Sequence, residues 1–266
     1  MIYILADNTP SYKEANAQPT VIYRNLMAEG TITNSTLPTT APRANAVSEG
    51  TFDYWLPASV PDTLQCTFGG AQTADGCLIA GHTLGSAGAT VNVQYYNGSS
   101  WVTLVSATPT DNDPILLLWP ARSATGWGIQ ITTAVAQISA LMIGPRLGIP
   151  GGIVPGYTPQ WASRVITKYP GVSRRGQYFG QRVERAGLSM SASFMPIEYS
   201  YALTTMAGFR KHYDDGKAFA WASAPSVFGE DCAYVWAPEG AVIRMPVLAG
   251  GQLVNLSIDM EGYAEP

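Results

Sequence analysis

The fold class is decided by the sequence Val91-Asn92-Val93-Gln94-Tyr95-Tyr96-Asn97-Gly98-Ser99-Ser100-Trp101-Val102-Thr103-Leu104-Val105. Apolar and polar residues alternate through 91–96, and the alternation resumes at Trp101, which is typical of two β-strands. Between them, Asn97-Gly98 tolerates the positive φ angles of a type I′ turn, whose twist matches that of paired strands. The stretch therefore predicts a β-hairpin.

Further strands are predicted on both sides of this hairpin. They cover residues 77–81, 126–132 and 138–144, and in 126–132 the side chains of Trp127, Ile129 and Ile131 share one face. Short strands at this spacing, separated by Gly, Pro, Asp and Asn, are typical of an antiparallel sandwich or jelly roll.

A connector divides the chain near its middle. Seven of the twelve residues in 145–156 are Pro or Gly, which no regular element tolerates. We therefore predict two domains, residues 1–148 and 149–266. In the second, residues 187–194, 218–221, 233–236 and 253–260 predict strands. The spacing of Ile197, Tyr201, Met206 and Phe209 predicts one helix over 197–212.

Composition narrows the range of functions. The chain has 266 residues, of which 46% are hydrophobic and only 13% are charged, so it can bury a sizeable core and is not intrinsically disordered. The formal net charge of −4 makes nucleic acid an unexpected ligand for the whole chain. The longest apolar run, residues 114–120, is far too short to span a membrane. So low a charge favours a surface that an assembly covers.

One basic run stands out in the second half of the chain. Six basic residues, with only Glu184 of opposite charge, fall within it: Arg164, Lys168, Arg174, Arg175, Arg182 and Arg185. Three interpretations remain open, namely a strand face that pairs with acidic neighbours, a contact to another subunit, and a polyanion site. The five arginines are candidate subunit-interface residues.

Residues for catalysis are not evident. The two histidines, His82 and His212, have no metal-ligand spacing, and no nucleophile elbow or phosphate loop is present. The acidic pair Asp111 and Asp113 lies in turn-like sequence, where Asp bends the backbone. We therefore predict no catalytic residue, no metal and no cofactor. The candidate residues for stacking on a glycan are aromatic: Trp55, Tyr95 and Tyr96.

The first half resembles a known fold family. Residues 51–55, 79–95, 127–131 and 138–144 are similar to discoidin-type, galactose-binding-like jelly rolls. Residues 80–91 (AGHTLGSAGATV) also resemble a run in virion proteins of tailed bacteriophages, which often carry Asn in place of Thr83. Residues 176–180, 217–221, 233–237 and 254–262 resemble distal tail and minor tail proteins of such phages.

This resemblance implies an all-β chain and a structural function. It implies a jelly-roll sandwich with an N-terminal extension, followed by a distal-tail-like β domain with one helix. The expected function is that of a non-enzymatic tail-tip or baseplate subunit in the virion, assembled in the host cytoplasm. Expected partners are further copies in a ring, a hexamer by resemblance to distal tail proteins, other tail proteins (tail tube, tape measure and hub) and a host cell-surface glycan, with no nucleic acid and no membrane insertion.

Two alternatives concern carbohydrate. The first is a carbohydrate-binding module of a host-adhesion protein, which binds a cell-surface glycan and has no enzymatic activity. The second is a glycan-degrading enzyme. Its only support in the sequence is the presence of neighbouring acidic residues such as Asp111 and Asp113, since glycosidases use paired carboxylates.

Overall fold

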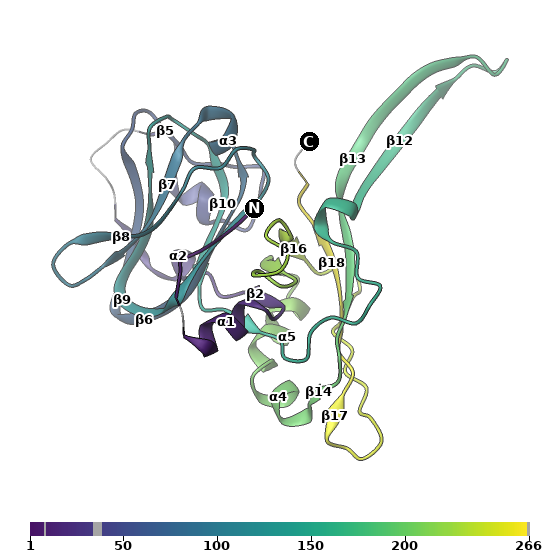
Figure 1. The fold of residues 1–266 in the computed structure, drawn as a ribbon. Helices are drawn as coiled ribbons and strands as arrows, with labels where there is room; N and C mark the ends of the chain where they lie inside the picture. Colours follow the sequence, from purple (N-terminus) through teal and green to yellow (C-terminus); the bar gives the residue numbers. More distant parts are fainter. Residues whose placement is uncertain (8, 34–38, 265–266) are drawn as a thin grey trace.

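A computed structural model describes the backbone of residues 1–7, 9–33 and 39–264, and within these ranges all side chains except those of Thr33, Thr39 and Arg185. Two large β-sheets form the framework of the fold (Figure 1). The strands of the first sheet are β1 (Ile2–Ile4), β3 (Thr31–Thr33), β6 (Asp62–His82), β7 (Thr90–Tyr96), β8 (Trp101–Ala107), β9 (Ile115–Thr132) and β10 (Ile138–Gly144). Short elements beside them are α2 (Leu26–Glu29), β4 (Thr39–Ala41), the 3₁₀ helix η1 (Arg43–Val47), β5 (Leu56–Pro57) and α3 (Leu84–Ala87).

The long strands β6 and β9 turn the first sheet into a sandwich. The beginning of β6 pairs with the end of β9, and its end pairs with the beginning of β9. Register shifts at Thr67/Gln72 and Ala74/Gly76 interrupt the ladder between these two parts. One layer therefore has the order β3-β6-β9-β7-β8, and the other has β10-β6-β9-β1.

The two layers enclose one apolar core, in which both halves of β6 and of β9 take part. Trp127, Ile129 and Ile131 are fully buried there, as their alternation predicts. The arrangement confirms the expected jelly-roll sandwich in an all-β fold.

The hairpin that fixes the fold class is present, but its turn differs from the prediction. β7 and β8 pair from Val91↔Ala107 to Tyr96↔Trp101, which leaves a loop of four residues, 97–100. The side-chain oxygen of Asn97 accepts hydrogen bonds from the backbone amides of Ser99 and Ser100, at 2.9 Å each. The amide of Asn97 also donates to the carbonyl of Ser100 at 3.0 Å, which places Gly98 and Ser99 at the centre of the turn. Gly98 has a positive φ and Asn97 does not, so this Asx-type turn replaces the predicted type I′ turn.

The second sheet has the strand order β11-β2-β15-β16-β18-β13-β12. Its strands are β2 (Thr20–Ile22), β11 (Leu147–Gly148), β12 (Arg164–Val172), β13 (Tyr178–Ser193), β15 (Phe219–Ala222), β16 (Cys232–Trp236) and β18 (Ser257–Gly262). β2 and β11 fall within the predicted first domain, yet they pair in this sheet. The division into domains 1–148 and 149–266 remains a prediction.

Apolar side chains join the two sheets. Leu78, Leu116 and Leu118 of the sandwich form a buried cluster with alanines of β15 and with Tyr234 of β16. The β10-β6-β9 layer is therefore covered on both faces, which explains why residues 115–118 are buried without alternation. The molecule is a stack of three β layers, and the second sheet packs its far face on α4 and α5. Among the described residues, the β6-β9-β7-β8 layer is the sandwich layer whose outer face no sheet covers.

The predicted single helix over 197–212 is divided in the structure. The segment consists of β14 (Ile197–Glu198), α4 (Tyr199–Thr204) and α5 (Ala207–Asp214). Ile197 pairs with Val254 of β17 (Leu253–Val254), which keeps it extended, and the carbonyl of Tyr201 accepts both the Thr205 and Met206 amides where α4 ends. The predicted strand 253–260 is likewise divided, into β17 and β18.

The remaining helices are short. They are α1 (Pro10–Asn16) and the 3₁₀ helix η2 (Gln160–Ala162). In the part of the chain that the structure describes, no helix has the length and apolarity needed to cross a membrane.

Candidate functional sites

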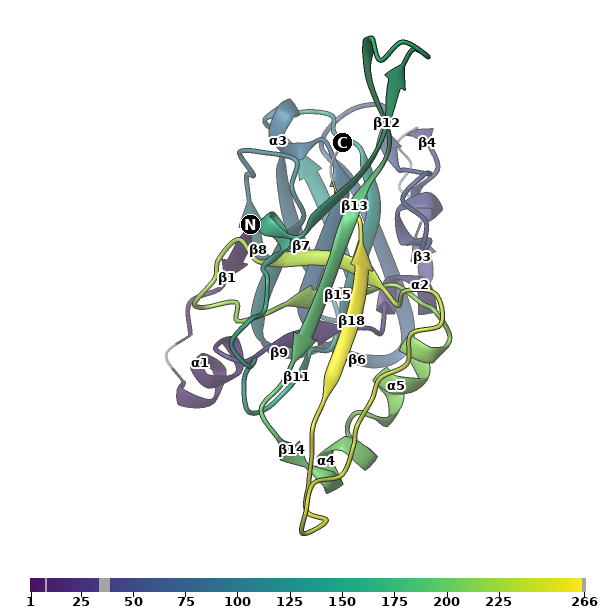
Figure 2. The ribbon, with the colours of Figure 1, turned by 90° about the vertical axis from the view of Figure 1, so that its right-hand side faces the viewer.

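A two-stranded arm projects from the edge of the second sheet. We define the arm as residues 164–187, in which β12 pairs with β13 from Arg164↔Leu188 to Val172↔Tyr178. β18 pairs with β13 only from Leu188 to Ser193, so the arm extends beyond it without a third strand. Figures 1 and 2 show the arm rising away from the body of the molecule past the end of β18.

Large apolar side chains are exposed along the arm. All nine residues of β12 are exposed, and Phe179 near the tip is 73% exposed. The exposed apolar residues of the arm are Val165, Ile166, Tyr169, Val172, Tyr178, Phe179 and Val183. So many exposed large apolar side chains in one short segment make the arm a candidate interaction surface, whereas single exposed apolar residues need no explanation.

The arm and the rest of the chain carry opposite charge. The arm has six basic residues and one acidic residue, which leaves nine basic and eighteen acidic residues in the remaining chain. The arm is therefore positive by five charges, and the remainder is negative by nine. The arm is therefore complementary in charge to an acidic surface and is repelled by another basic one.

The structure brings the predicted interface arginines together on the arm. Arg164 begins it, Arg174 and Arg175 lie in the loop at its tip, and Arg182 lies on β13. The backbone of Arg185 belongs to β13 as well, and its side chain lies outside the described residues. The sequence also contains the signal of the apolar surface, because Val165, Ile166 and Tyr169 are interspersed with these basic residues.

The predicted glycan-stacking residues do not form one site. Trp55 is fully buried, with the guanidinium carbon of Arg43 5.9 Å from the centre of its ring, so its assignment as an exposed stacking residue is wrong. The loop around it folds inward, because Trp55 exchanges backbone hydrogen bonds with Ile138 of β10.

Tyr95 and Tyr96 are half-buried and lie on opposite faces of β7. Tyr95 packs on the core beside Trp127 and receives the guanidinium of Arg122 at 4.5 Å from its ring centre. Tyr96 faces outward and contacts Trp101, with 5.6 Å between the ring centres. Trp101 is thus a half-exposed aromatic residue outside the predicted set of Trp55, Tyr95 and Tyr96. Stacking by Tyr95 or Tyr96 remains a prediction.

His82 is locked as a neutral ring. Its Nε2 donates to the backbone oxygen of Asp113 at 2.9 Å, and its Nδ1 accepts the amide of Leu84 at 3.3 Å. Burial lowers the pKa of His82 to about 4. With both nitrogens used in this way, His82 fixes two loops at one end of the sandwich. The backbone amide of Asp113 donates to the Asp111 carboxylate, a hydrogen bond that is typical of an Asx turn.

A buried carboxylate anchors the end of the connector. Asp231 accepts hydrogen bonds from the hydroxyl of Tyr157 at 3.0 Å, from the amide of Gln160 at 2.8 Å and from the hydroxyl of Ser223. Burial and the neighbouring Asp231 raise the pKa of Tyr157. These three donors occupy the buried Asp231 carboxylate. Asp231 therefore holds residues 157–160 against the second sheet.

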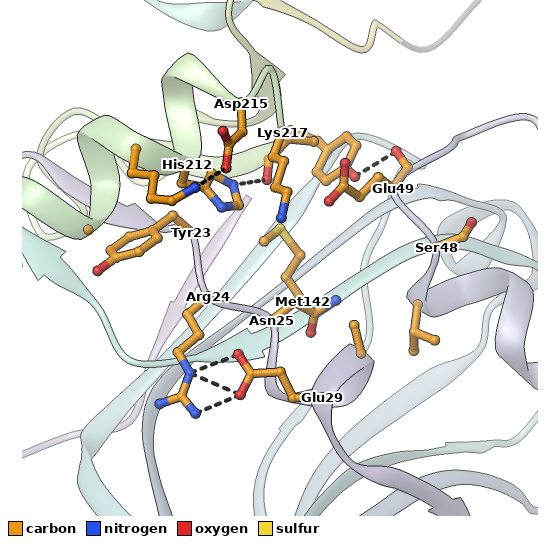
Figure 3. A pocket seen from close by; sticks show the side chains of 16 residues that line it. Tyr23, Arg24, Asn25, Glu29, Ser48, Glu49, Met142, His212, Asp215 and Lys217 are labelled. Carbon is orange, nitrogen blue, oxygen red and sulfur yellow. Dashed lines mark hydrogen bonds and ion pairs between the residues drawn. The ribbon is translucent and has the colours of Figure 1, made fainter.

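A cleft of about 370 Å³ lies between the sandwich and α5 (Figure 3). Its charged groups are largely paired on their own walls, as Arg24 with Glu29 at 2.6 Å and Lys211 with Asp215 at 2.9 Å. His212 donates from Nε2 to the carbonyl of Ala218 at 2.9 Å, and burial lowers its pKa. Charges of both signs line the cleft, so it does not select a ligand of one sign.

The other reactive groups are buried. Cys66, Cys77 and Cys232 are free thiols without exposure, and burial raises the pKa of Cys66 to about 12. Among the described residues, no group of three or more His, Cys, Asp or Glu side chains is arranged to hold a metal ion.

Comparison with known proteins adds a limited likeness. No protein-family model matches the chain, and no curated protein matches it. Among solved structures, the family 32 carbohydrate-binding module of NanJ from C. perfringens, in complex with galactose, is 16% identical with a TM-score of 0.39. The match covers 48% of this chain and 99% of that one.

Chitosan-binding module 2 of a chitosanase/glucanase from Paenibacillus sp. IK-5, in complex with chitotriose, is 19% identical with a TM-score of 0.38, over 45% of this chain and 99% of that one. SpGH29 is 17% identical with a TM-score of 0.39, and the match covers 47% of this chain but only 28% of SpGH29. At these scores the likeness supports no conclusion about function.

Proposed function

We propose that the protein is a non-enzymatic structural subunit of a bacteriophage tail tip or baseplate, present there in several copies. The observation that carries the proposal is the arm, with its exposed apolar side chains and its excess of positive charge. The tail location rests on the resemblance of residues 80–91 and of the second half to phage tail proteins.

The physics of a two-stranded ribbon supports a partner for the arm. Such a ribbon is marginally stable in water at best, because neither of its faces is buried. Its outer edge also presents unpaired backbone groups, which proteins cover. A partner that packs on Tyr169, Tyr178 and Phe179 would stabilise the arm and remove its apolar surface from water.

The charges support a head-to-tail contact between copies. Acidic side chains exposed on the body include Asp214, Asp215 and Glu230, and the basic arm of a neighbouring copy would face them. A head-to-tail contact closes into a ring when the rotation between copies fits, and the resemblance to distal tail proteins favours six copies. Exposed ion pairs contribute only about 0–1 kcal/mol each, so the apolar contacts supply most of the affinity.

The position of the protein in an intact virion tests this proposal. We expect density for several copies in a ring at the tail tip, with the sandwich on the outside. Its absence from the tail tip, or its presence there as a single copy, would refute the ring. The variant Arg174→Glu with Arg175→Glu should weaken assembly while the subunit stays folded, whereas Lys13→Glu, an exposed charge reversal on α1, should leave assembly unchanged.

Glycan binding by the sandwich is a second candidate function, compatible with the first. The observation that favours it is the half-exposed pair Tyr96 and Trp101 on the one sandwich layer whose outer face no sheet covers. In a tail tip, such a site would contribute to attachment to the host surface.

A further inference from the structure

The outer face of the β6-β9-β7-β8 layer is polar and carries no charge. Inward residues such as Leu64, Val93 and Ile129 belong to the core, so the alternate residues of each strand point outward. In residues 62–67 of β6, 126–132 of β9, and all of β7 and β8, the outward residues are Thr, Gln, Asn, Ser, Gly, Tyr and Trp. None of these side chains has a formal charge.

Amide side chains form a connected network across this face. Gln65 donates to Gln94 at 2.8 Å, Gln94 donates to Gln130 at 3.5 Å, and Asn92 donates to Gln130 at 3.4 Å. Ser106 on β8 closes the series by donating to Asn92 at 2.7 Å. The network spans four strands, or three interstrand spacings of about 4.8 Å. Its length of about 14 Å exceeds a single sugar ring.

The network is both rigid and open to a ligand. The side chain of Gln94 is at the centre and is only 7% exposed, so its amide is held in one orientation. Over the described residues, the Nε2 group of Gln130 and the indole Nε1 of Trp101 have no hydrogen-bond partner in the protein. These donors are available at the surface.

An aromatic pair borders the amides. Trp101 pairs with Tyr96 across β7 and β8, and both are half-exposed. Gly126 makes room for the indole, because a Cβ atom there would lie 2.8 Å from Trp101 Cη2. The indole therefore lies against the sheet next to the amides, with part of its surface open to solvent.

We infer that this face is a binding site for a neutral oligosaccharide. The inference rests on the second proposed function and assigns it a place, the outer sheet face. Sugar hydroxyls donate and accept hydrogen bonds, as primary amides do, and the C–H groups of a sugar ring pack on Trp and Tyr. An ionic ligand would find no opposite charge here. A protein partner would require an apolar centre, which the amide network does not offer.

The test is a titration of the full chain with neutral hexasaccharides: maltohexaose, cellohexaose, xylohexaose and N-acetylchitohexaose. Isothermal titration should detect binding of at least one probe with a Kd of about 1 mM or tighter. Trp101→Ala and Gln130→Glu should each weaken this binding at least about tenfold. Thermal unfolding checks that each variant is folded. If Trp101→Ala is unfolded, the Kd of Gln130→Glu alone decides the test.

Two control variants separate the site from the function. Trp161→Ala removes a tryptophan that is 70% exposed on η2 and should leave binding unchanged. Phe52 is 84% exposed in the loop before Trp55 and is the competing aromatic site. Binding that Phe52→Ala abolishes and Trp101→Ala retains would overturn the sheet-face site but leave glycan binding intact.

Two further outcomes overturn the inference. Absence of binding for all four probes with folded protein would refute both the site and glycan binding. A dimer that Trp101→Ala dissociates, without saccharide binding, would show that this face packs on a second copy and would likewise refute the site.

Discussion

Acidification from pH 8 to pH 4.5 should destabilise the protein through His82. The ring donates to a backbone oxygen from Nε2 and accepts the Leu84 amide on Nδ1, so it fits only in its neutral form. Protonation would turn Nδ1 into a donor that faces another donor. Burial is the main cause that lowers the pKa of His82 from 6.5 to about 4.

The magnitude follows from proton linkage. The unfolded chain takes up the proton near pH 6.5, whereas the folded chain resists it until about pH 4. The stability contributed by His82 is therefore fully present above pH 6.5 and is lost as the pH falls toward 4. With these two pKa values, the free energy of unfolding falls by about 2.5 kcal/mol between pH 8 and pH 4.5.

The assay compares urea unfolding of the natural chain and of His82→Gln at both pH values, followed by circular dichroism. His212 and the carboxylates titrate in both proteins, so the difference between the two pH dependences isolates His82. The natural chain should lose about 2.5 kcal/mol more than the variant. If the free energy of unfolding falls equally in both proteins, within about 0.5 kcal/mol, the reasoning that the folded chain accepts only the neutral ring of His82 is refuted.

Two further substitutions test the packing. Leu118→Ala removes a fully buried side chain between the sandwich and the second sheet. It should lower the free energy of unfolding by about 3 kcal/mol, whereas Leu203→Ala, at a side chain 55% exposed, should change it by less than about 0.5 kcal/mol. An equal effect of both would contradict the shared apolar contact. Gly85→Ala drives a Cβ into the backbone oxygen of Asp111 and should cost about 2 kcal/mol or more in urea unfolding. Gly69→Ala, where the Cβ meets nothing within 4 Å, is the matched control, and a neutral Gly85→Ala would show that the two loops are not in close contact.

Local periodicity predicts most of the sandwich. The alternation in 91–96, 101–105 and 126–132 identifies strands and their buried faces correctly, because one face of each packs on the core. The unbroken apolar run Ile115–Leu118 is a signal of burial on both faces. Only the structure identifies the second sheet as the layer that covers it.

Features that depend on distant neighbours are harder to predict. The arm is a two-stranded extension because β18 pairs with β13 no further than Leu188, a contact between segments some seventy residues apart. Trp55 is buried because its backbone pairs with Ile138, which its local sequence does not reveal. The placement of β2 beside β15 is also a long-range pairing, so the N-terminal segment was not expected in the second sheet.

The amide network is another feature that the local sequence does not predict. Gln65, Asn92, Gln94 and Gln130 come from three strands, and only the register brings them into contact. Each is an ordinary outward-facing residue in its own strand. The aromatic ring of Tyr96 is therefore recognisable from the sequence, whereas the polar face beside it is not.

The most direct test of the central claim, that the arm joins copies of this chain, is a photo-crosslinker placed at Phe179 in the assembled particle. Phe179 is 73% exposed near the arm tip and lies at a register shift between β12 and β13, so we expect the substitution to leave their pairing intact. We expect crosslinked dimers of this chain, with the crosslinks mapping to the acidic body of the second copy. Crosslinks confined to the same chain, or arm-to-arm crosslinks alone, would contradict it.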